Sequence, residues 1–371
     1  MKVLMVAPSV RVPDTLGQTL HQLALANGLA NRGLDVTLLC RYNPKSANTQ
    51  NLNPDLKFLP IVNPGIPFER IIFTRHSYKK VLSELDSKNY DIVHDRGYIF
   101  AGSGVKAASE MGVKSILQVD DNWIRSELSA TKVARLWPYN EKAIRSCRDQ
   151  IERADGGFTV STILRNQISK WNSKANNFAV IQNGYEDELF TPEAEPLGIK
   201  EKLNIKGDIA VFVGALGPWH GTDELVEIAR RNPDLNVVVA GGGYGQNLPE
   251  LSNLHHIGRL ERSDVPRLLV ESDIGLAPYP RVDYGFSPLK IYEYMGCKLP
   301  VVATSLPSVK EATQGNALLV APGQMASAVS KIMSNKRLLS ELSESAYSYA
   351  SSRRTWENTI DKTIDLYKKT I

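Results

Sequence analysis

The chain has 371 residues, of which 42% are hydrophobic and 23% are charged. This length is too great for one core of ordinary size and predicts two domains. No apolar run reaches the roughly 18–20 residues that a membrane-spanning helix needs. The net charge of +4 is too small to indicate a nucleic-acid partner.

The cysteine pattern bears on metal binding and on the cellular compartment. Cys40, Cys147 and Cys297 lie far apart and form no Cys-x-x-Cys motif or Cys/His cluster. This spacing argues against a metal site or a disulfide framework. We therefore expect a reducing compartment, and a cytoplasmic location is the default.

The chain begins with "MKVLMVAPSV", which is too short for a signal peptide and predicts a first β-strand instead. Strands then alternate with helices, which predicts parallel sheets with right-handed crossovers. In the first half we expect a helix at 16–33 and strands at 2–8, 35–40, 91–96, 115–120, 157–161 and 178–183.

The basic excess belongs to the first half of the chain. Segments 68–82 and 131–153 mix cations with large apolar residues at helical spacing. Such helices can rest on an anionic membrane, which would place the protein at the inner membrane face. An ordinary solvated helix face explains the same pattern, and both interpretations stay open.

A Pro- and Glu-rich break at 191–200 precedes a second set of alternating elements. We predict strands at 209–216, 236–243, 254–260, 274–279 and 300–304, and helices at 222–231, 263–271 and 288–295. The pattern predicts two doubly wound α/β domains, residues 1–185 and 186–354. The segment 353–369 is expected to hold a terminal helix, and residues 355–371 are expected to pack back on the first domain as that helix.

The stretch "FSPLKIYEYMGCKLPVVAT", residues 286–304, carries the strongest binding signal. Ser287 suits the N-cap of a helix and Pro288 suits its first position. The free amide groups of the first turn and the helix dipole favour an anion such as phosphate. Lys290 and Glu293 follow Ser287 at intervals of three residues, so these three side chains share a helix face.

Several segments occur in one order and spacing: "VIQNGYEDELF", "FVGALGPWHGTDELVEIA", "VVVAGGGYG", "HHIGRLERSDVPRLLVESDIGLAPY" and the stretch "SPLKIYEYMGCKLPVVAT". Together they resemble the C-terminal domain of the GT-B glycosyltransferases of family 4, the group 1 glycosyl transferases. The first half resembles the same family through the Gly17 loop, "LANRGLDVTLL" and "RADGGFTVSTILRNQI".

The resemblance implies two Rossmann-like domains facing across a cleft, an acceptor-binding domain at 1–185 and a donor-binding domain at 186–354. It implies a retaining, metal-independent hexosyl or other glycosyl transfer that needs no cofactor. The donor would be a UDP- or GDP-linked sugar, and the acceptor a glycan, a lipid-linked glycan or a small metabolite.

The resemblance also assigns roles to residues. Glu293 would hold the ribose hydroxyls, and Lys290, His220 and the Gly17 amide would stabilise the departing diphosphate. The donor-binding residues that it implies are Gly17, Gly214, His220, Gly243, Tyr244, Gly258, Arg259, Phe286, Ser287, Pro288, Leu289, Lys290 and Glu293.

Four positions depart from the family pattern. Ala215 and His220 stand where relatives commonly carry Arg and Lys, and a nearby diphosphate should raise the pKa of His220. Gly285 replaces a sugar-binding Glu, so the amide of Phe286 or Ser287, or another side chain, would substitute. Asp120 replaces a His near the anomeric centre.

Asp120 would hydrogen-bond a sugar hydroxyl or accept the acceptor's proton, or else it is only a loop carboxylate. With His220 and Lys290 it completes the predicted catalytic set. His94, Asp95 and Asp121 are candidates on the acceptor side, because ligands bind at the carboxyl ends of parallel strands.

Two other functions stay open, and a third lacks the motif that it requires. A nucleotide-sugar epimerase would share the fold, and a binding protein that has lost catalysis would explain the departures from the pattern. A dinucleotide-dependent oxidoreductase would need Gly-x-Gly-x-x-Gly in the first strand-to-helix turn, where "VAPSVRVPDTLGQT" lacks it.

Overall fold

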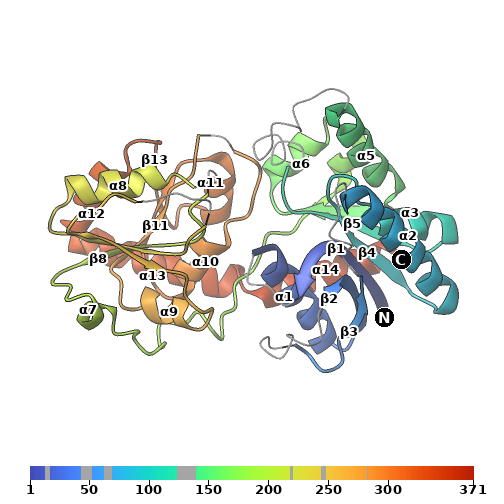
Figure 1. The fold of residues 1–371 in the computed structure, drawn as a ribbon, viewed down its shortest axis with the longest axis horizontal. Helices are drawn as coiled ribbons and strands as arrows, with labels where there is room; N and C mark the ends of the chain where they lie inside the picture. Colours follow the sequence, from blue (N-terminus) through green and yellow to red (C-terminus); the bar gives the residue numbers. More distant parts are fainter. Residues whose placement is uncertain are drawn as a thin grey trace. The chain divides into compact units, whose positions relative to one another are not determined.

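A computed structural model of the chain describes residues 1–12, 17–42, 52–61, 69–122, 139–217, 220–243, 248–281 and 283–371. The chain divides into two compact units, each built on its own parallel sheet (Figure 1). The first unit contains Met1–Gln182, Tyr284–Phe286 and Trp356–Ile371. The second contains Asn183–Asp283 and Ser287–Thr355.

The first unit holds a sheet with strand order β3-β2-β1-β4-β5-β6-β7, in which all paired strands are parallel. Its strands are β1 Lys2–Val12, β2 Asp35–Tyr42, β3 Lys57–Pro60, β4 Ile92–Arg96, β5 Ser115–Val119, β6 Gly156–Thr159 and β7 Ala179–Val180. Its helices are α1 Gly17–Asn31, α2 Glu69–Ser87, α3 Ser103–Met111, α5 Tyr139–Arg153, α6 Thr162–Ile168, a 3-10 helix at Ser173–Asn177, and α14 Trp356–Thr370.

The second unit repeats this topology with strand order β10-β9-β8-β11-β12-β13. Its strands are β8 Ile209–Val213, β9 Asn236–Ala240, β10 Leu254–Gly258, β11 Ile274–Ala277, β12 Val301–Thr304 and β13 Leu318–Val320. Its helices are α7 Ile199–Lys202, α8 Thr222–Arg231, α9 Asp264–Leu269, α10 Leu289–Gly296, α11 Pro307–Thr313, α12 Met325–Met333 and α13 Lys336–Arg353. The prediction of two doubly wound, Rossmann-like domains is confirmed.

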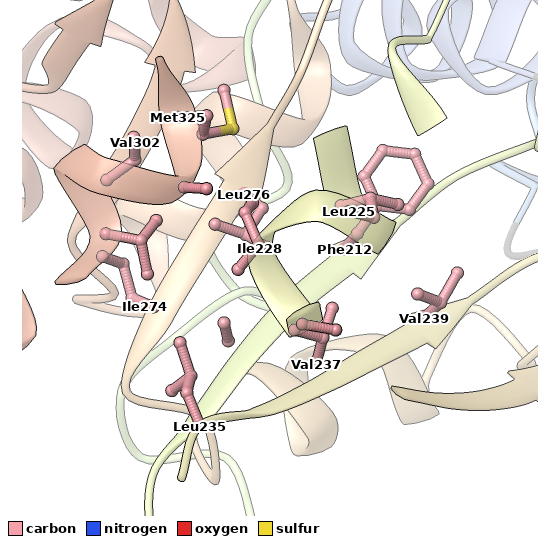
Figure 2. Close-up of a cluster of buried hydrophobic side chains, with 14 of the residues drawn as sticks. Phe212, Leu225, Ile228, Leu235, Val237, Val239, Ile274, Leu276, Val302 and Met325 are labelled. Atoms are coloured by element: carbon pink, nitrogen blue, oxygen red, sulfur yellow. The ribbon is translucent and has the colours of Figure 1, made fainter. Parts of the chain in front are cut away.

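The central strands are buried on both faces, which is why they are continuous apolar runs without alternation. In the first unit, Leu4, Val6 and Val93 pack against α2 and α3. In the second unit, residues of β8, β9, β11 and β12 pack against α8 and α12, and Figure 2 shows Phe212 and Leu276 in this cluster. This packing fixes the positions of the strands, and several predicted site residues lie at or just after the strand ends.

The terminal helix α14 belongs to the first unit and packs on α1. A Cβ atom at Gly28 of α1 would lie only 1.9 Å from Ile360 Cδ1 of α14. Glycine therefore allows the two helices to approach closely. The predicted terminal helix at 353–369 is in fact the end of α13 followed by α14, because the chain leaves the helix at Arg354 and Thr355.

Candidate functional site

The carboxyl edge of the second sheet is formed by glycine backbone. Gly214, Gly241 and Gly258 end or follow β8, β9 and β10, and all have positive φ. The Gly241 amide donates to the Gly258 carbonyl at 2.6 Å. A Cβ atom at Gly241 would lie 1.9 Å from the Gly214 carbonyl oxygen. At Gly241 backbone packs against backbone, so a side chain does not fit there, and the positive φ of all three residues favours glycine.

The surroundings of the other predicted donor-binding residues described near this edge, Gly243 and Arg259, do not indicate a ligand contact. Gly243 has a φ of +98°, and no atom of the described residues lies within 4 Å of an added Cβ. Arg259 is exposed. Tyr244 lies outside the described residues. The structure thus brings Gly214 and Gly258 to one sheet edge and leaves the ligand roles of Gly243 and Arg259 as predictions.

Helix α10 begins one residue later than predicted. Its N-cap is Pro288, whose ring offers no hydrogen-bonding group, and its first helical residue is Leu289. Ser287 does not cap the helix, because its hydroxyl accepts from the Asn183 amide at 3.2 Å and lies 3.2 Å from the Tyr292 hydroxyl. Among the described residues no side chain caps α10, so the amide groups of Leu289 and Lys290 are open to an anion.

Lys290 lies in the first turn of α10 and reaches over the glycine edge. Its Nζ atom lies 4.1 Å from the centre of the Phe212 ring and would lie 2.7 Å from a Cβ atom at Gly214. Burial lowers the pKa of the Lys290 ammonium to about 7, although the charge of Glu293 acts in the opposite direction. A partly desolvated ammonium beside open amide groups is suited to bind an anion.

His220 supports Lys290 and does not carry a charge of its own. Its Nδ1 atom lies 2.6 Å from the Ala215 carbonyl oxygen, which can only accept, so Nδ1 carries the proton. Its Nε2 atom is left to accept from Lys290 Nζ at 2.9 Å. Burial, and then the Lys290 charge, lower the pKa of His220 to about 3.

The predicted rise in the pKa of His220 concerns a complex with diphosphate and stays a prediction, whereas burial lowers this pKa in the protein without ligand. The sequence shows a histidine near a Gly-rich loop, but it does not show that the ring is buried beside a lysine. His220 is therefore neutral, and its single N–H group donates to the Ala215 carbonyl oxygen.

Glu293 is 7% exposed and forms an ion pair that the sequence did not predict. Its Oε1 atom lies 2.7 Å from Nη1 of Arg262, in the loop before α9. The same guanidinium donates through Nη2 to Glu186 Oε1 at 2.8 Å and stacks on the Phe190 ring at 4.4 Å. Arg262 and Glu186 occur in the quoted segments "GRLERSD" and "NGYEDELF", yet no local spacing links them to Glu293.

The Gly285 position has a packing reason to lack a side chain. Its φ is +76°, its carbonyl accepts from Ser161 Oγ at 3.0 Å, and an added Cβ would lie 2.8 Å from the Leu164 backbone. A glutamate therefore does not fit there without rearrangement.

Phe286 is half-buried, and its amide as a substitute ligand remains a prediction. Gly17 is the first residue of α1, and its phosphate contact also remains a prediction.

In the first unit, Asp120 is an ion-paired carboxylate at the end of β5. Arg96 Nε donates to its Oδ2 atom at 2.7 Å, Gln118 Nε2 donates to Oδ1 at 2.7 Å, and His21 Nδ1 lies 3.7 Å away. Burial opposes the charged form, but Arg96 and His21 together hold the pKa of Asp120 well below its usual range. Such a weak base is poorly suited to accept the acceptor's proton. Asp121 is half-buried, and its role is still a prediction.

His94 is fully buried, which contradicts its prediction as an acceptor-side residue. Its Nε2 atom lies 2.7 Å from Gln118 Oε1 and its Nδ1 atom 2.6 Å from the Tyr367 hydroxyl. Since the amide oxygen accepts, Nε2 carries the proton and Tyr367 donates to Nδ1. His94 thus links helix α14 to Gln118 and, through it, to Asp120.

Asp95 is also fully buried and serves the start of α3. Its Oδ2 atom accepts from the Val105 amide at 2.9 Å, and a Cβ at Gly104 would lie 2.8 Å from its carboxyl group. Neither His94 nor Asp95 is exposed to an acceptor. Both predictions followed from strand ends alone, which do not show that α3 and α14 cover these side chains.

The two basic segments lie only partly within the described residues. The described parts form most of α2 and all of α5, where Arg153 pairs with Asp149 at 2.8 Å. Within the described residues, no helix has the length and apolar character needed to cross a bilayer. Membrane contact remains a prediction.

Two sequence profiles match the chain. The profile described as "Glycosyltransferase Family 4" matches residues 16–189, and the profile described as "Glycosyl transferases group 1" matches residues 207–335. The first profile falls largely on the first unit, and the second profile falls largely on the second unit.

Individual proteins show the same similarity. TuaH of Bacillus subtilis, a protein named for teichuronic acid biosynthesis, is 25% identical over 253 residues, covering 65% of this chain and 63% of TuaH. The D-inositol 3-phosphate glycosyltransferase of Mycobacterium sp. (strain JLS) is 24% identical over 328 residues, covering 79% of this chain and 71% of the relative. The matched part of TuaH is thus less than two thirds of its length.

The fold is shared with a solved structure, Anabaena Alr3699/HepE in complex with UDP-glucose. The TM-score is 0.76 with 16% sequence identity, and the match covers 100% of both chains. The two profiles match in chain order, one on each half, and the sheets have the matching doubly wound topology. The chain therefore belongs to the group 1 glycosyl transferases and has the GT-B fold.

Proposed function

We propose that this chain is a glycosyltransferase that uses a nucleoside-diphosphate sugar, UDP- or GDP-linked, as its donor. The observation that carries the proposal is the position of Lys290, whose ammonium lies over the Gly214 edge beside the uncapped start of α10. A lysine, two open amide groups and a helix dipole supply the positive charge that a diphosphate needs. HepE, whose structure contains UDP-glucose, supports a sugar nucleotide as the donor.

The proposed reaction breaks the bond between the sugar C1 atom and the β-phosphate oxygen. Lys290 and the α10 amide groups stabilise the charge that develops on the departing diphosphate. The acceptor hydroxyl forms its bond to C1 on the face that the diphosphate leaves, and its proton passes to a phosphate oxygen. The anomeric configuration is thus retained, and the scheme needs no metal ion and no cofactor.

Glu293 is proposed to accept hydrogen bonds from the ribose hydroxyls of the donor. A buried carboxylate with a fixed orientation can read a vicinal diol, and charge-assisted hydrogen bonds are about twice as strong as neutral ones. Gly17 and His220 remain proposed contributors near the diphosphate, His220 through its contact with Lys290.

The first unit is proposed to bind the acceptor, a glycan, a lipid-linked glycan or a small molecule. The relatives named for teichuronic acid biosynthesis and for D-inositol 3-phosphate support a polyhydroxylated acceptor. We propose a cytoplasmic location, with peripheral membrane contact through the basic first half.

Calorimetry with UDP, GDP, ADP and NAD on the wild type and on Glu293→Ala tests the proposal. We expect one nucleoside diphosphate to bind to the wild type and to bind far more weakly to the variant. Release of that diphosphate from its sugar conjugate, in the presence of acceptor, would then distinguish a transferase from a binding protein without catalysis. Interconversion of the sugar without acceptor would indicate an epimerase, and no nucleotide binding would contradict the proposal.

A further inference from the structure

Arg262 holds Glu293 in one orientation through contacts on both sides of its guanidinium group. Nη1 lies 2.7 Å from Glu293 Oε1, Nη2 donates to Glu186 at 2.8 Å, and the planar face lies 4.4 Å over Phe190. A planar fork fixed by two carboxylates and a ring has little freedom to rotate. Both partners of Arg262 therefore have defined geometry.

Glu293 depends on this arrangement because it is buried. A buried carboxylate without a partner pays a large desolvation penalty, and the arginine supplies the compensating charge. Burial lowers the pKa of Arg262, but the charges of Glu293 and Glu186 outweigh it, so the net shift is upward. Arg262 is thus a permanent cation in this cluster.

The two oxygens of Glu293 have different surroundings. Oε1 is occupied by Arg262, whereas Oε2 has no hydrogen-bond partner among the described residues. Lys290 precedes Glu293 by three residues, so the two side chains lie on the same face of α10. An anion bound by Lys290 would therefore bring its attached ribose close to the free oxygen.

From this geometry we infer that Arg262 is a positioning residue that sets the preference of the donor site for ribonucleotides over deoxyribonucleotides. This inference rests on the proposed function, because it assigns Glu293 to the ribose. Arg262 acts through Glu293 and does not need to touch the donor. Its removal should affect recognition of the hydroxyls far more than binding of the diphosphate.

The test is calorimetry with UDP and 2′-deoxy-UDP, or with the guanosine pair if GDP binds more tightly. We expect the wild type to prefer the ribonucleotide by about tenfold or more, the size of a charged hydrogen bond. Arg262→Met should reduce that ratio to about twofold or less, while the affinity for the deoxynucleotide changes by less than about threefold. Glu293→Gln should reduce the ratio by a similar factor.

Arg267→Met is the matched control, because Arg267 lies on the adjacent helix α9 and pairs with Asp264 at 2.8 Å. It should keep the wild-type ratio. The double variant Arg262→Met/Glu293→Gln should show the same preference for the ribonucleotide as Glu293→Gln alone. Both changes act on the same interaction, that of Glu293 with the ribose, so their effects should not add. If Arg262→Met does not fold, Arg262→Lys, which keeps the charge but loses the fork, is measured in its place and should also lower the ratio.

An unchanged ratio in a folded Arg262 variant would overturn the inference. An equal loss of affinity for both nucleotides would overturn it as well, because that result indicates general damage to the site. Failure of the wild type to bind any nucleoside diphosphate would instead contradict the proposed function itself.

Discussion

The Lys290 ammonium lies 2.9 Å from the Nε2 atom of His220, a neutral ring whose other nitrogen is fixed by the Ala215 carbonyl. The neighbouring ring accepts a hydrogen bond but does not supply a negative charge. The charge of Glu293, on the same helix, favours the protonated form of Lys290. A bound anion should favour that form further.

The first prediction concerns the pH dependence of nucleotide binding. Burial holds the pKa of Lys290 at about 7 in the free protein, and a bound diphosphate should raise it. The complex then takes up a proton above neutral pH. UDP affinity should fall as pH rises from about 7 to about 8.5, by up to about tenfold per pH unit.

Calorimetry at several pH values measures this dependence. Lys290→Met is the control, because the ionisation of UDP affects both proteins equally and only the wild type has the Lys290 ammonium. The variant should bind more weakly and lose the extra pH dependence. Wild-type affinity that stays constant over this range would show that Lys290 does not change its protonation on binding.

The second prediction uses Gly214. A Cβ atom at this position would lie 2.7 Å from Lys290 Nζ, so Gly214→Ala must displace the ammonium. We expect UDP affinity to fall by about tenfold, the loss of one charged hydrogen bond. Gly315→Ala is the control, because Gly315 also has positive φ but nothing lies within 4 Å of its added Cβ. Equal effects of the two changes on UDP affinity would refute the assigned role of Gly214.

The sequence predicts well the strand ends, glycines and helix starts around the candidate site, because each of these depends on residues that are close together in the sequence. Strand, glycine and helix follow one another at each sheet edge, and Lys290 and Glu293 are placed by helical spacing. The parallel pairing of the strands also follows from the alternation of strands with helices. Even so, α10 begins one residue later than predicted, because the Ser287 hydroxyl forms hydrogen bonds with Asn183 and Tyr292 and does not cap the helix.

Residues that meet only in the folded chain could not be predicted in this way. Arg262 pairs with Glu293 across a long sequence separation, and no pattern marks that pair. The protonation of His220 and the burial of Asp95 depend on which helices cover them. Desolvation is a property of tertiary packing, so the direction of these pKa shifts is not visible in a motif.

The third prediction concerns the buried link between α14 and the first sheet. Tyr367→Phe removes the donor to His94 Nδ1 and leaves that buried nitrogen without a partner. The free energy of unfolding should fall by about 1–3 kcal/mol, measured by urea denaturation. Tyr78→Phe is a matched control that removes a bond to Glu110 nearer the surface, with an expected loss of less than about 1 kcal/mol. A Tyr367→Phe variant as stable as the control would show that the link does not support the fold.

The last prediction concerns Asp95, whose carboxyl group is buried and whose Oδ1 atom has no hydrogen-bond partner within the part of the chain that the structure describes. Burial raises its pKa to about 7, although the Val105 and Gly104 amide groups favour the charged form. A raised folded-state pKa means that Asp95 contributes most to stability below its unfolded pKa of about 3.9 and that this contribution is lost as pH rises toward 7. Asp95→Asn keeps an oxygen acceptor but cannot titrate. The difference in unfolding free energy, variant minus wild type, should therefore increase from about pH 4 to about pH 7 and level off above it. Urea denaturation of both proteins across this range measures the difference, which cancels the titration of all other groups. A difference that decreases with pH would mean that the amide groups of α3 outweigh desolvation and that Asp95 is a charged helix cap.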